Sequence, residues 1–190
     1  MIARGKAVRV GDRKITSSRL TAHFKYIEHR SRGLAHEQRE DQCLFSKDQD
    51  TVLRREARDD VIEHTSDRIS YHKILLSPAE DEPVWDWRKW TRDVMADLEE
   101  AQGKELHWYA VHHQDTENPH VHVVVAAVGY DWETGEKEMV KLSRQDYAQL
   151  RTSGHDYSEY AWEHRIEELF RELERQDRRI FPYAHRKLSN

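Results

Sequence analysis

Four histidines lie within one short segment, residues 112–122, and their spacing suggests metal chemistry. Two of them, His120 and His122, alternate with a row of valines: Val121, Val123 and Val125. Alternate side chains of a β-strand project to the same face, so the two imidazoles should share one face, about 7 Å apart along the strand. Because imidazole is the commonest protein ligand for a metal, the pattern predicts two metal ligands opposite a packed row of valines.

The third ligand should come from the preceding strand, where the alternation of side chains favours His113 over His112. His112 shares its parity with the more apolar row, which is Leu106, Trp108 and Ala110. His113 therefore falls on the same face as the other two histidines, and His112 becomes the alternative if a bulge shifts the register. Asp115 or Glu117, between the two strands, is a candidate to orient one of the imidazoles.

A site built from three histidines would leave coordination positions open. The single cysteine, Cys43, excludes an internal disulfide framework and a cysteine-rich zinc module. Open positions favour a catalytic ion over a structural one. The alternative is ordinary polar pairing on a sheet surface, which is common for an isolated His-x-His pair but less so for three histidines of consistent parity.

Strand patterns flank these histidines and must hold them in place. Ile69–Leu76 is rich in β-forming residues, and a short polar loop joins Leu106–His113 to His120–Val128 as in an antiparallel hairpin. Shorter strands are predicted at Ala7–Val10 and Met139–Leu142. With amphipathic helices between them, these strands predict an α+β fold, in which helices cover one face of a mainly antiparallel sheet and the histidines occupy the other.

Apolar residues at helical spacing predict the helices, and capping residues mark their ends. The predicted caps are Ser17 or Ser18 for the first helix, Asp50 for the second, Gly103 at the end of the third, and a Ser143–Asp146 capping box for the fourth. A C-terminal helix and basic tail are predicted for residues 158–190. No repeat and no Pro/Gly-rich linker divides the chain, so we expect a single domain over residues 1–190.

The charge of the chain is unevenly distributed. The net charge of −5 argues at first against a nucleic-acid partner, but residues 1–32 carry nine basic and two acidic side chains, or +7, which leaves −12 for the rest. Six Trp, eight Tyr and four Phe supply a core that disordered chains lack. No apolar run is long enough to span a membrane, and the N-terminus lacks the apolar region of a secretion signal, so a cytoplasmic location is expected.

Two further segments combine with the histidine cluster into a recognisable set. Residues 113–125 read HQDTENPHVHVVV, residues 22–30 read AHFKYIEHR, and residues 74–81 read ILLSPAED. In this order along the chain, they resemble the metal motif, the tyrosine-bearing helix and the Ser-Pro-Glu-Asp strand end of HUH endonucleases. Within that superfamily the resemblance is closest to relaxases of conjugative and mobilisable plasmids, the VirD-like mobilisation class.

The resemblance implies a core of about five antiparallel strands and a defined reaction. A relaxase nicks single-stranded DNA at a plasmid origin of transfer, with site and strand specificity, and uses one divalent ion, Mg²⁺ or Mn²⁺. Here His113, His120 and His122 would hold the ion. Tyr26 would attack phosphorus to give a 5′-phosphotyrosyl enzyme and a free 3′-hydroxyl.

Other residues acquire roles from the same resemblance. Asp115 and Asp81 are candidates for a supporting group or a general base, and the basic residues near Tyr26 would hold DNA phosphates: Lys25, Arg30 and Arg32. The partners implied are single-stranded DNA at an origin of transfer, accessory relaxosome proteins and secretion machinery.

Several alternatives remain open at this point. His23 and His29 on the same predicted helix are other potential phosphate nucleophiles, and Tyr26 could instead be a core residue beside Phe24 and Ile27. A replication initiator or single-tyrosine transposase would carry its tyrosine after the His-x-His pair, where this chain has Tyr147, Tyr157 and Tyr160. A non-catalytic DNA-binding module and an unrelated metal hydrolase are the remaining readings.

Overall fold

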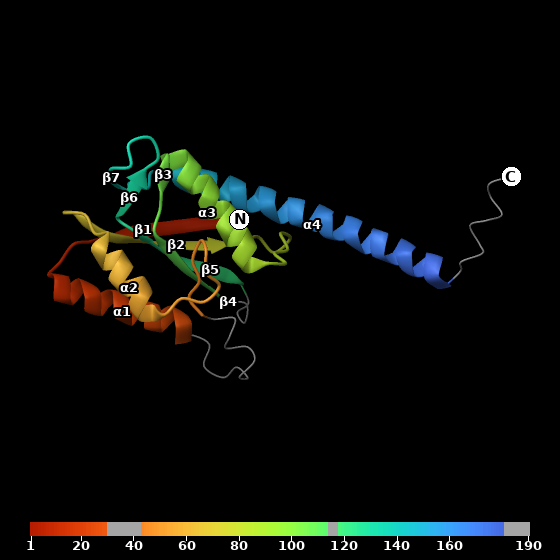
Figure 1. The fold of residues 1–190 in the computed structure, drawn as a ribbon, viewed down its shortest axis with the longest axis horizontal. Coiled ribbons are helices and arrows are strands. Elements are labelled where there is room, and N and C mark those ends of the chain that lie inside the picture. Colours follow the sequence, from red (N-terminus) through yellow and green to blue (C-terminus); the bar gives the residue numbers. More distant parts are fainter. Residues whose placement is uncertain (30–42, 114–117, 181–190) are drawn as a thin grey trace.

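A computed structural model describes residues 1–29, 43–113 and 118–180 (Figure 1). The helices are α1 (Arg13–His29), α2 (Arg54–Glu63), α3 (Trp87–Gln102) and α4 (Arg144–Ile180). The strands are β1 (Ile2–Arg9), β2 (Ile69–Ser77), β3 (Lys104–Glu105), β4 (Trp108–His113), β5 (His120–Ala126), β6 (Val128–Asp131) and β7 (Lys137–Met139). No helix in these ranges is both long and apolar enough to cross a membrane.

Two antiparallel sheets form the β structure. The larger has the strand order β1-β2-β5-β4, and the smaller has the order β3-β6-β7. The predicted α+β class, the antiparallel character and the β4–β5 pairing are therefore confirmed. The larger sheet has four strands, one fewer than the approximate five implied by the resemblance, because the chain after β5 turns away into the smaller sheet.

One face of the larger sheet carries the row of valines expected from β5. Val121, Val123 and Val125 pack with Trp90 and Val94 of α3 in a buried apolar core. On this face, the predicted Gly103 cap of α3 and the predicted Ser143–Asp146 capping box of α4 are confirmed, and Asp86 is an additional cap that was not predicted. Asp86 accepts a hydrogen bond from the Lys89 backbone and Gly103 ends α3 in the left-handed conformation, while Ser143 and Asp146 exchange backbone-to-side-chain bonds at the start of α4.

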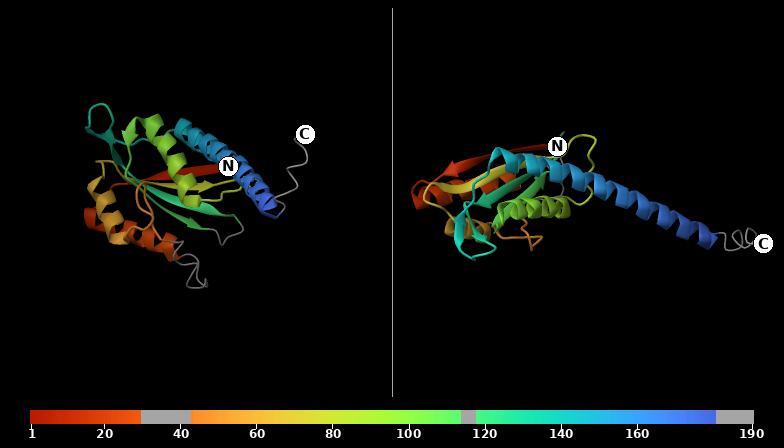
Figure 2. Two further views of the ribbon diagram at one scale, coloured as in Figure 1. Left: turned by 45° about the vertical axis from the view of Figure 1, so that its right-hand side comes forward. Right: turned by 90° about the horizontal axis from the view of Figure 1, so that it is seen from above.

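The other face of the sheet, which carries the histidines, is also covered, and this corrects the prediction of helices on one face alone. Leu20, Phe24 and Ile27 of α1 pack with Val111 and Val124 in a second buried core, to which α2 also contributes. Figure 2 shows α1 and α2 on one side of the larger sheet and α3 and α4 on the other. The apolar residues that share the histidine parity require this second cover.

Three helix boundaries differ from the prediction, and so do two strands, since β1 begins before Ala7 and β7 ends at Met139. Asp12, and not Ser17 or Ser18, caps α1, because its carboxylate accepts from the Lys14 backbone at 2.9 Å. The second helix begins after Leu53 without a side-chain cap, so Asp50 does not start it. Residues 158–180 are helical, as predicted, but they continue α4 and do not form a separate helix; residues 181–190 lie outside the described part of the chain.

Candidate metal and nucleophile site

The three candidate metal ligands converge at one end of the larger sheet. His113 of β4 lies opposite His120 of β5, and His122 lies opposite Val111. The centroids of the three rings are 4.9–5.1 Å apart, and one nitrogen from each lies within 4.8 Å of the other two. We call His113, His120 and His122 the sheet-end cluster.

The rings of the sheet-end cluster are steeply inclined to one another, at 68–82°. The lone pair of an imidazole nitrogen lies in the plane of its ring, so a bound ion must lie in or near that plane as well. Steeply inclined ring planes can intersect close to the rings, and such an arrangement allows one ion to meet all three lone pairs. The angles suit shared coordination.

Backbone carbonyls determine which ring nitrogen of two of the histidines carries the proton. His113 Nε2 lies 2.5 Å from the carbonyl of Ile27, and His120 Nδ1 lies 2.8 Å from the carbonyl of Asn118. A carbonyl only accepts, so each of these nitrogens must donate, and the opposite nitrogen presents a lone pair. His113 Nδ1 and Nε2 of both His120 and His122 are shielded from solvent. For His120 Nε2, the described residues supply no hydrogen-bond partner, as expected of a nitrogen that binds a metal.

His112 lies on the opposite face of the sheet from its neighbour. Its ring stacks on Trp87 of α3, with centroids 6.2 Å apart and planes at 13°, and it is buried. The register shows no bulge between β4 and β5. The structure therefore brings His113, and not His112, into the cluster, as the parity of the strand predicted.

The last turns of α1 lie against the sheet-end cluster. The ring of His23 meets that of His122 edge-on at 6.5 Å, and the Ile27 carbonyl meets His113 as described above. Phe24 and Ile27 are fully buried, whereas Tyr26 is 54 % exposed. The interpretation of Tyr26 as a core residue is wrong: its ring is accessible, one residue away from a direct contact with a candidate ligand.

His23 occupies an environment that keeps its imidazole neutral. Burial lowers its pKa, and the nearby cations Lys73 and Lys6 lower it further, to about 4. At neutral pH the ring adds no positive charge to the cluster and retains a lone pair. His29 ends α1.

The other candidate tyrosines lie on α4, which packs on the face of the sheet away from the histidines. Tyr157 donates to Asp97 at 2.8 Å, and this hydrogen bond, with burial, raises its pKa to about 12. Burial also raises the pKa of Tyr147, which packs against the core beneath α4. Tyr160 is exposed and its hydroxyl meets His164. None of the three contacts the sheet-end cluster among the described residues.

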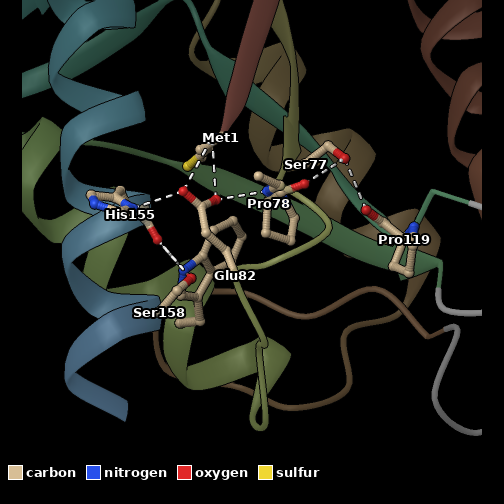
Figure 3. A network of polar contacts seen from close by, with 10 residues as sticks. Met1, Ser77, Pro78, Glu82, Pro119, His155 and Ser158 are labelled. Carbon is tan, nitrogen blue, oxygen red and sulfur yellow. Dashed lines mark hydrogen bonds and ion pairs between the residues drawn. The ribbon is translucent and has the colours of Figure 1, made fainter. Parts of the chain in front are cut away.

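The turn after β2 contacts both the segment that leads into His120 and helix α4 (Figure 3). Ser77 Oγ donates to the carbonyl of Pro119 at 3.0 Å and so ties the end of β2 to the residue before His120. Glu82 accepts from the Ala79 backbone at 2.7 Å and pairs with His155 of α4 at 2.7 Å. These contacts fix the backbone on either side of the Ser-Pro turn.

The remaining predicted residues are placed only in part. Lys25 is exposed on α1 beside Tyr26, and Asp81 is exposed in the turn after β2, with no described bond to a histidine. Arg30, Arg32 and Asp115 lie outside the described residues.

A second group of potential ligands, not predicted from the sequence, lies at the far end of the histidine face. Asp60 of α2 and His64, the C-cap of that helix, meet His107, which precedes β4, and one ligand atom from each lies within 4.8 Å of the others. We call these three residues the helix-side cluster. The i,i+4 spacing of Asp60 and His64 is visible in the sequence, but their contact with a residue far along the chain is not.

Each member of the helix-side cluster forms at least one hydrogen bond within the protein. The Asp60 carboxylate accepts from Tyr109 at 2.7 Å and from His107 Nδ1 at 3.1 Å, and His64 Nδ1 lies 2.8 Å from the Asp60 carbonyl. His64 Nε2 faces the Tyr130 hydroxyl at 3.2 Å. Burial tends to raise the pKa of Asp60, but the bonds from His107 and Tyr109 and the charge of the histidines lower it overall.

The ring geometry of the helix-side cluster opposes coordination. His64 and His107 are stacked, with centroids 3.8 Å apart and planes at 19°. Nearly parallel planes do not meet between the rings, so one ion cannot lie in both. The ring geometry therefore favours the sheet-end cluster over the helix-side cluster as a metal site.

Comparison with known proteins identifies the family. The family model described as "Relaxase: MobA/VirD2-like, nuclease domain" matches residues 26–178, which is most of the chain and includes Tyr26, the Ser-Pro turn and the sheet-end cluster. A search of curated proteins found no match. The chain belongs to the relaxase family, as a MobA/VirD2-like nuclease domain.

Proposed function

We propose that the protein is a DNA relaxase that nicks one strand at a plasmid origin of transfer and so initiates conjugative mobilisation. The family assignment supports a relaxase nuclease and its single-stranded DNA partner. The observation that carries the proposal is the contact between α1 and the sheet-end cluster, in which the Ile27 carbonyl binds His113 and the neighbouring Tyr26 is exposed.

His113, His120 and His122 would hold one divalent ion, Mg²⁺ or Mn²⁺, through His113 Nδ1 and the Nε2 atoms of the other two. Such an ion supplies Lewis-acid polarisation of the scissile phosphate and offsets the charge that develops on its oxygens. The backbone carbonyls of Ile27 and Asn118 hold two of the rings in the required tautomer.

Tyr26 would supply the nucleophile. Its hydroxyl oxygen forms a bond to phosphorus as the bond to the 3′ oxygen breaks, which gives a 5′-phosphotyrosyl enzyme and a free 3′-hydroxyl. The phenol proton passes to a base, for which Asp81 and Asp115 are the proposed candidates, and the departing 3′ oxygen takes up a proton from solvent to become the 3′-hydroxyl. Reversal of the step rejoins the strand, because the covalent bond conserves the energy of the phosphodiester.

Lys25, Arg30 and Arg32 would hold DNA phosphates beside Tyr26. In a mobilisation system the enzyme would act in the cytoplasm with accessory relaxosome proteins and secretion machinery.

The test is incubation with a pool of single-stranded DNA and Mn²⁺, with a chelator control, followed by a denaturing gel. We expect a covalent adduct that mass spectrometry maps to Tyr26, that Tyr26→Phe abolishes and that Tyr160→Phe, an exposed tyrosine on α4, retains. An adduct on Tyr157 or Tyr160 would indicate an initiator or transposase instead. If DNA binds but stays intact with every metal ion and every origin sequence tried, the result would contradict the proposal and favour a non-catalytic module.

A further inference from the structure

Three basic side chains lie on the β1–β2 half of the histidine face. Ala3 of β1 packs into the core beneath α3 and α4, so the alternating residues Arg4 and Lys6 project to the opposite face. On β2, Lys73 shares its parity with Tyr71, which packs in the core beneath α1 and α2. We call Arg4, Lys6 and Lys73 the basic strip.

The pairing of β1 with β2 places two of these cations directly against each other. Lys6 lies opposite Lys73 in the antiparallel register. Like charges in this position destabilise a sheet. Burial lowers the pKa of the half-buried Lys73, and the neighbouring Lys6 lowers it further. Among the described residues, no carboxylate forms an ion pair with any member of the basic strip. An anion bound beside Lys6 and Lys73 would relieve the repulsion between them.

The basic strip leads to the sheet-end cluster. Arg4 lies opposite Leu75, and Leu75 lies opposite His122, so Arg4 and His122 occupy the same row two strands apart. At the usual spacing of strands this is about 10 Å. Lys6 and Lys73 also lie close enough to His23 to lower its pKa, and His23 contacts His122.

β1 is the edge of the larger sheet, so the strip is open along one side. The residues of β1 that contact α4 lie on the other face: a Cβ on Gly5 would meet the Tyr147 hydroxyl, and Arg4 and Lys6 themselves are exposed. A row of cations on an open edge fits an extended polyanion better than a small anion in a closed pocket.

We propose that the basic strip binds the phosphodiester backbone of single-stranded DNA and guides it to the sheet-end cluster. The identity of the anion rests on the proposed function, whereas the anion site itself rests on the opposed lysines, which have no carboxylate partner among the described residues. Two phosphate contacts, one each from Lys6 and Lys73, would be sequence-independent and sensitive to salt.

The test measures binding without cleavage. The full chain is titrated in EDTA against a fluorescein-labelled oligothymidylate, with fluorescence anisotropy recorded over a range of salt concentrations. For the double variant Lys6→Ala/Lys73→Ala we expect roughly tenfold weaker binding at low salt and a decrease of about 1.4 in the salt slope, or about 0.7 for each lost phosphate contact. Lys6→Arg/Lys73→Arg should retain both values.

Two controls keep the test specific. Lys89→Ala removes one positive charge from α3 on the other face of the sheet, where Lys89 pairs with Asp93, and should leave binding unchanged. The double alanine variant should melt no lower than the wild type, because it removes a like-charge pair. Equal affinities of the double variant and Lys89→Ala, with both folded, would overturn the basic strip.

The outcome is separable from that of the proposed function. A wild-type protein that forms the Tyr26 adduct while the double variant binds normally would refute the strip and leave the relaxase proposal intact. A wild-type protein that binds DNA through the basic strip but forms no adduct would refute the relaxase proposal and leave the basic strip intact.

Discussion

The sheet-end and helix-side clusters have almost the same composition but opposite geometry. In the sheet-end cluster three imidazoles stand at 68–82° to one another, whereas in the helix-side cluster two imidazoles are stacked at 19°. The first has buried ring nitrogens within 4.8 Å of one another, and the second directs its donors at the Asp60 carboxylate and carbonyl. Proximity of histidines therefore does not define a metal site; the direction of the lone pairs and the presence of other acceptors decide.

The elements that carry the clusters explain the contrast. β4 and β5 present side chains at a fixed spacing across a hairpin, so His113, His120 and His122 converge without a carboxylate between them. In the helix-side cluster, Asp60 of α2 lies between the two imidazoles and also accepts from Tyr109, which joins the helix to the sheet. The first arrangement suits chemistry and the second suits packing.

The largest expected difference between the clusters is in catalysis. His122→Ala should lower the single-turnover rate of adduct formation on the order of 10²–10³-fold, because it removes a proposed ligand of the ion that would stabilise the transition state. His107→Asn, in the helix-side cluster, should change the rate by less than about threefold while the protein remains folded. To measure the rates, each variant is mixed with single-stranded DNA and Mn²⁺, the reaction is quenched at a series of times, and the covalent adduct is resolved on a denaturing gel. Equal losses of rate in the two variants would contradict the functional distinction between the two clusters.

A second difference is in stabilisation by metal. Mn²⁺ at a hundred times its dissociation constant should raise the free energy of unfolding by about 2.7 kcal/mol, because the ion binds the folded chain alone. His120→Asn should abolish this increase, and His107→Asn should retain it. Urea unfolding monitored by tryptophan fluorescence, with and without Mn²⁺, gives both values. An increase lost in His107→Asn but kept in His120→Asn would reverse the assignment.

The helix-side cluster should in turn contribute more to stability in the absence of metal. Asp60→Asn should lower the free energy of unfolding by about 1–3 kcal/mol at pH 7, since it removes a charged acceptor of two hydrogen bonds. The folded-state pKa of Asp60 lies below its ordinary value of 3.8, so the contribution is present above that pH and is lost as the pH falls through the folded-state pKa.

Denaturant titrations at several pH values check this prediction. Asp59→Asn, on the exposed side of the same helix, should cost less than about 1 kcal/mol. A difference between Asp60→Asn and the wild type that grows toward acid pH would contradict the proposed hydrogen-bonding role.

The parts of the fold that followed from the sequence are those set by local patterns. The alternation of β5 fixes the faces of His120 and Val121, and the parity of β4 distinguishes His113 from His112. The caps Gly103 and Ser143 lie where their residue types predict. Each of these features depends on neighbours within a few residues.

The parts that did not follow depend on contacts between distant residues. Helices α1 and α2 cover the histidine face because Tyr109, Val111 and Val124 lie on the same face as the three histidines and are hydrophobic. The strand pattern alone does not show that these residues need a cover. β1 was predicted only at its end, because its exposed face carries cations. The meeting of Asp60 with His107 required the tertiary structure.

The most direct test of the account is the position of a bound ion. Crystals of the wild-type protein grown with Mn²⁺ are measured at a wavelength where manganese scatters anomalously. We predict one anomalous peak between His113 Nδ1 and the Nε2 atoms of His120 and His122, and none beside Asp60. A peak between His64 and His107, or the absence of a peak at the sheet-end cluster, would contradict the central claim.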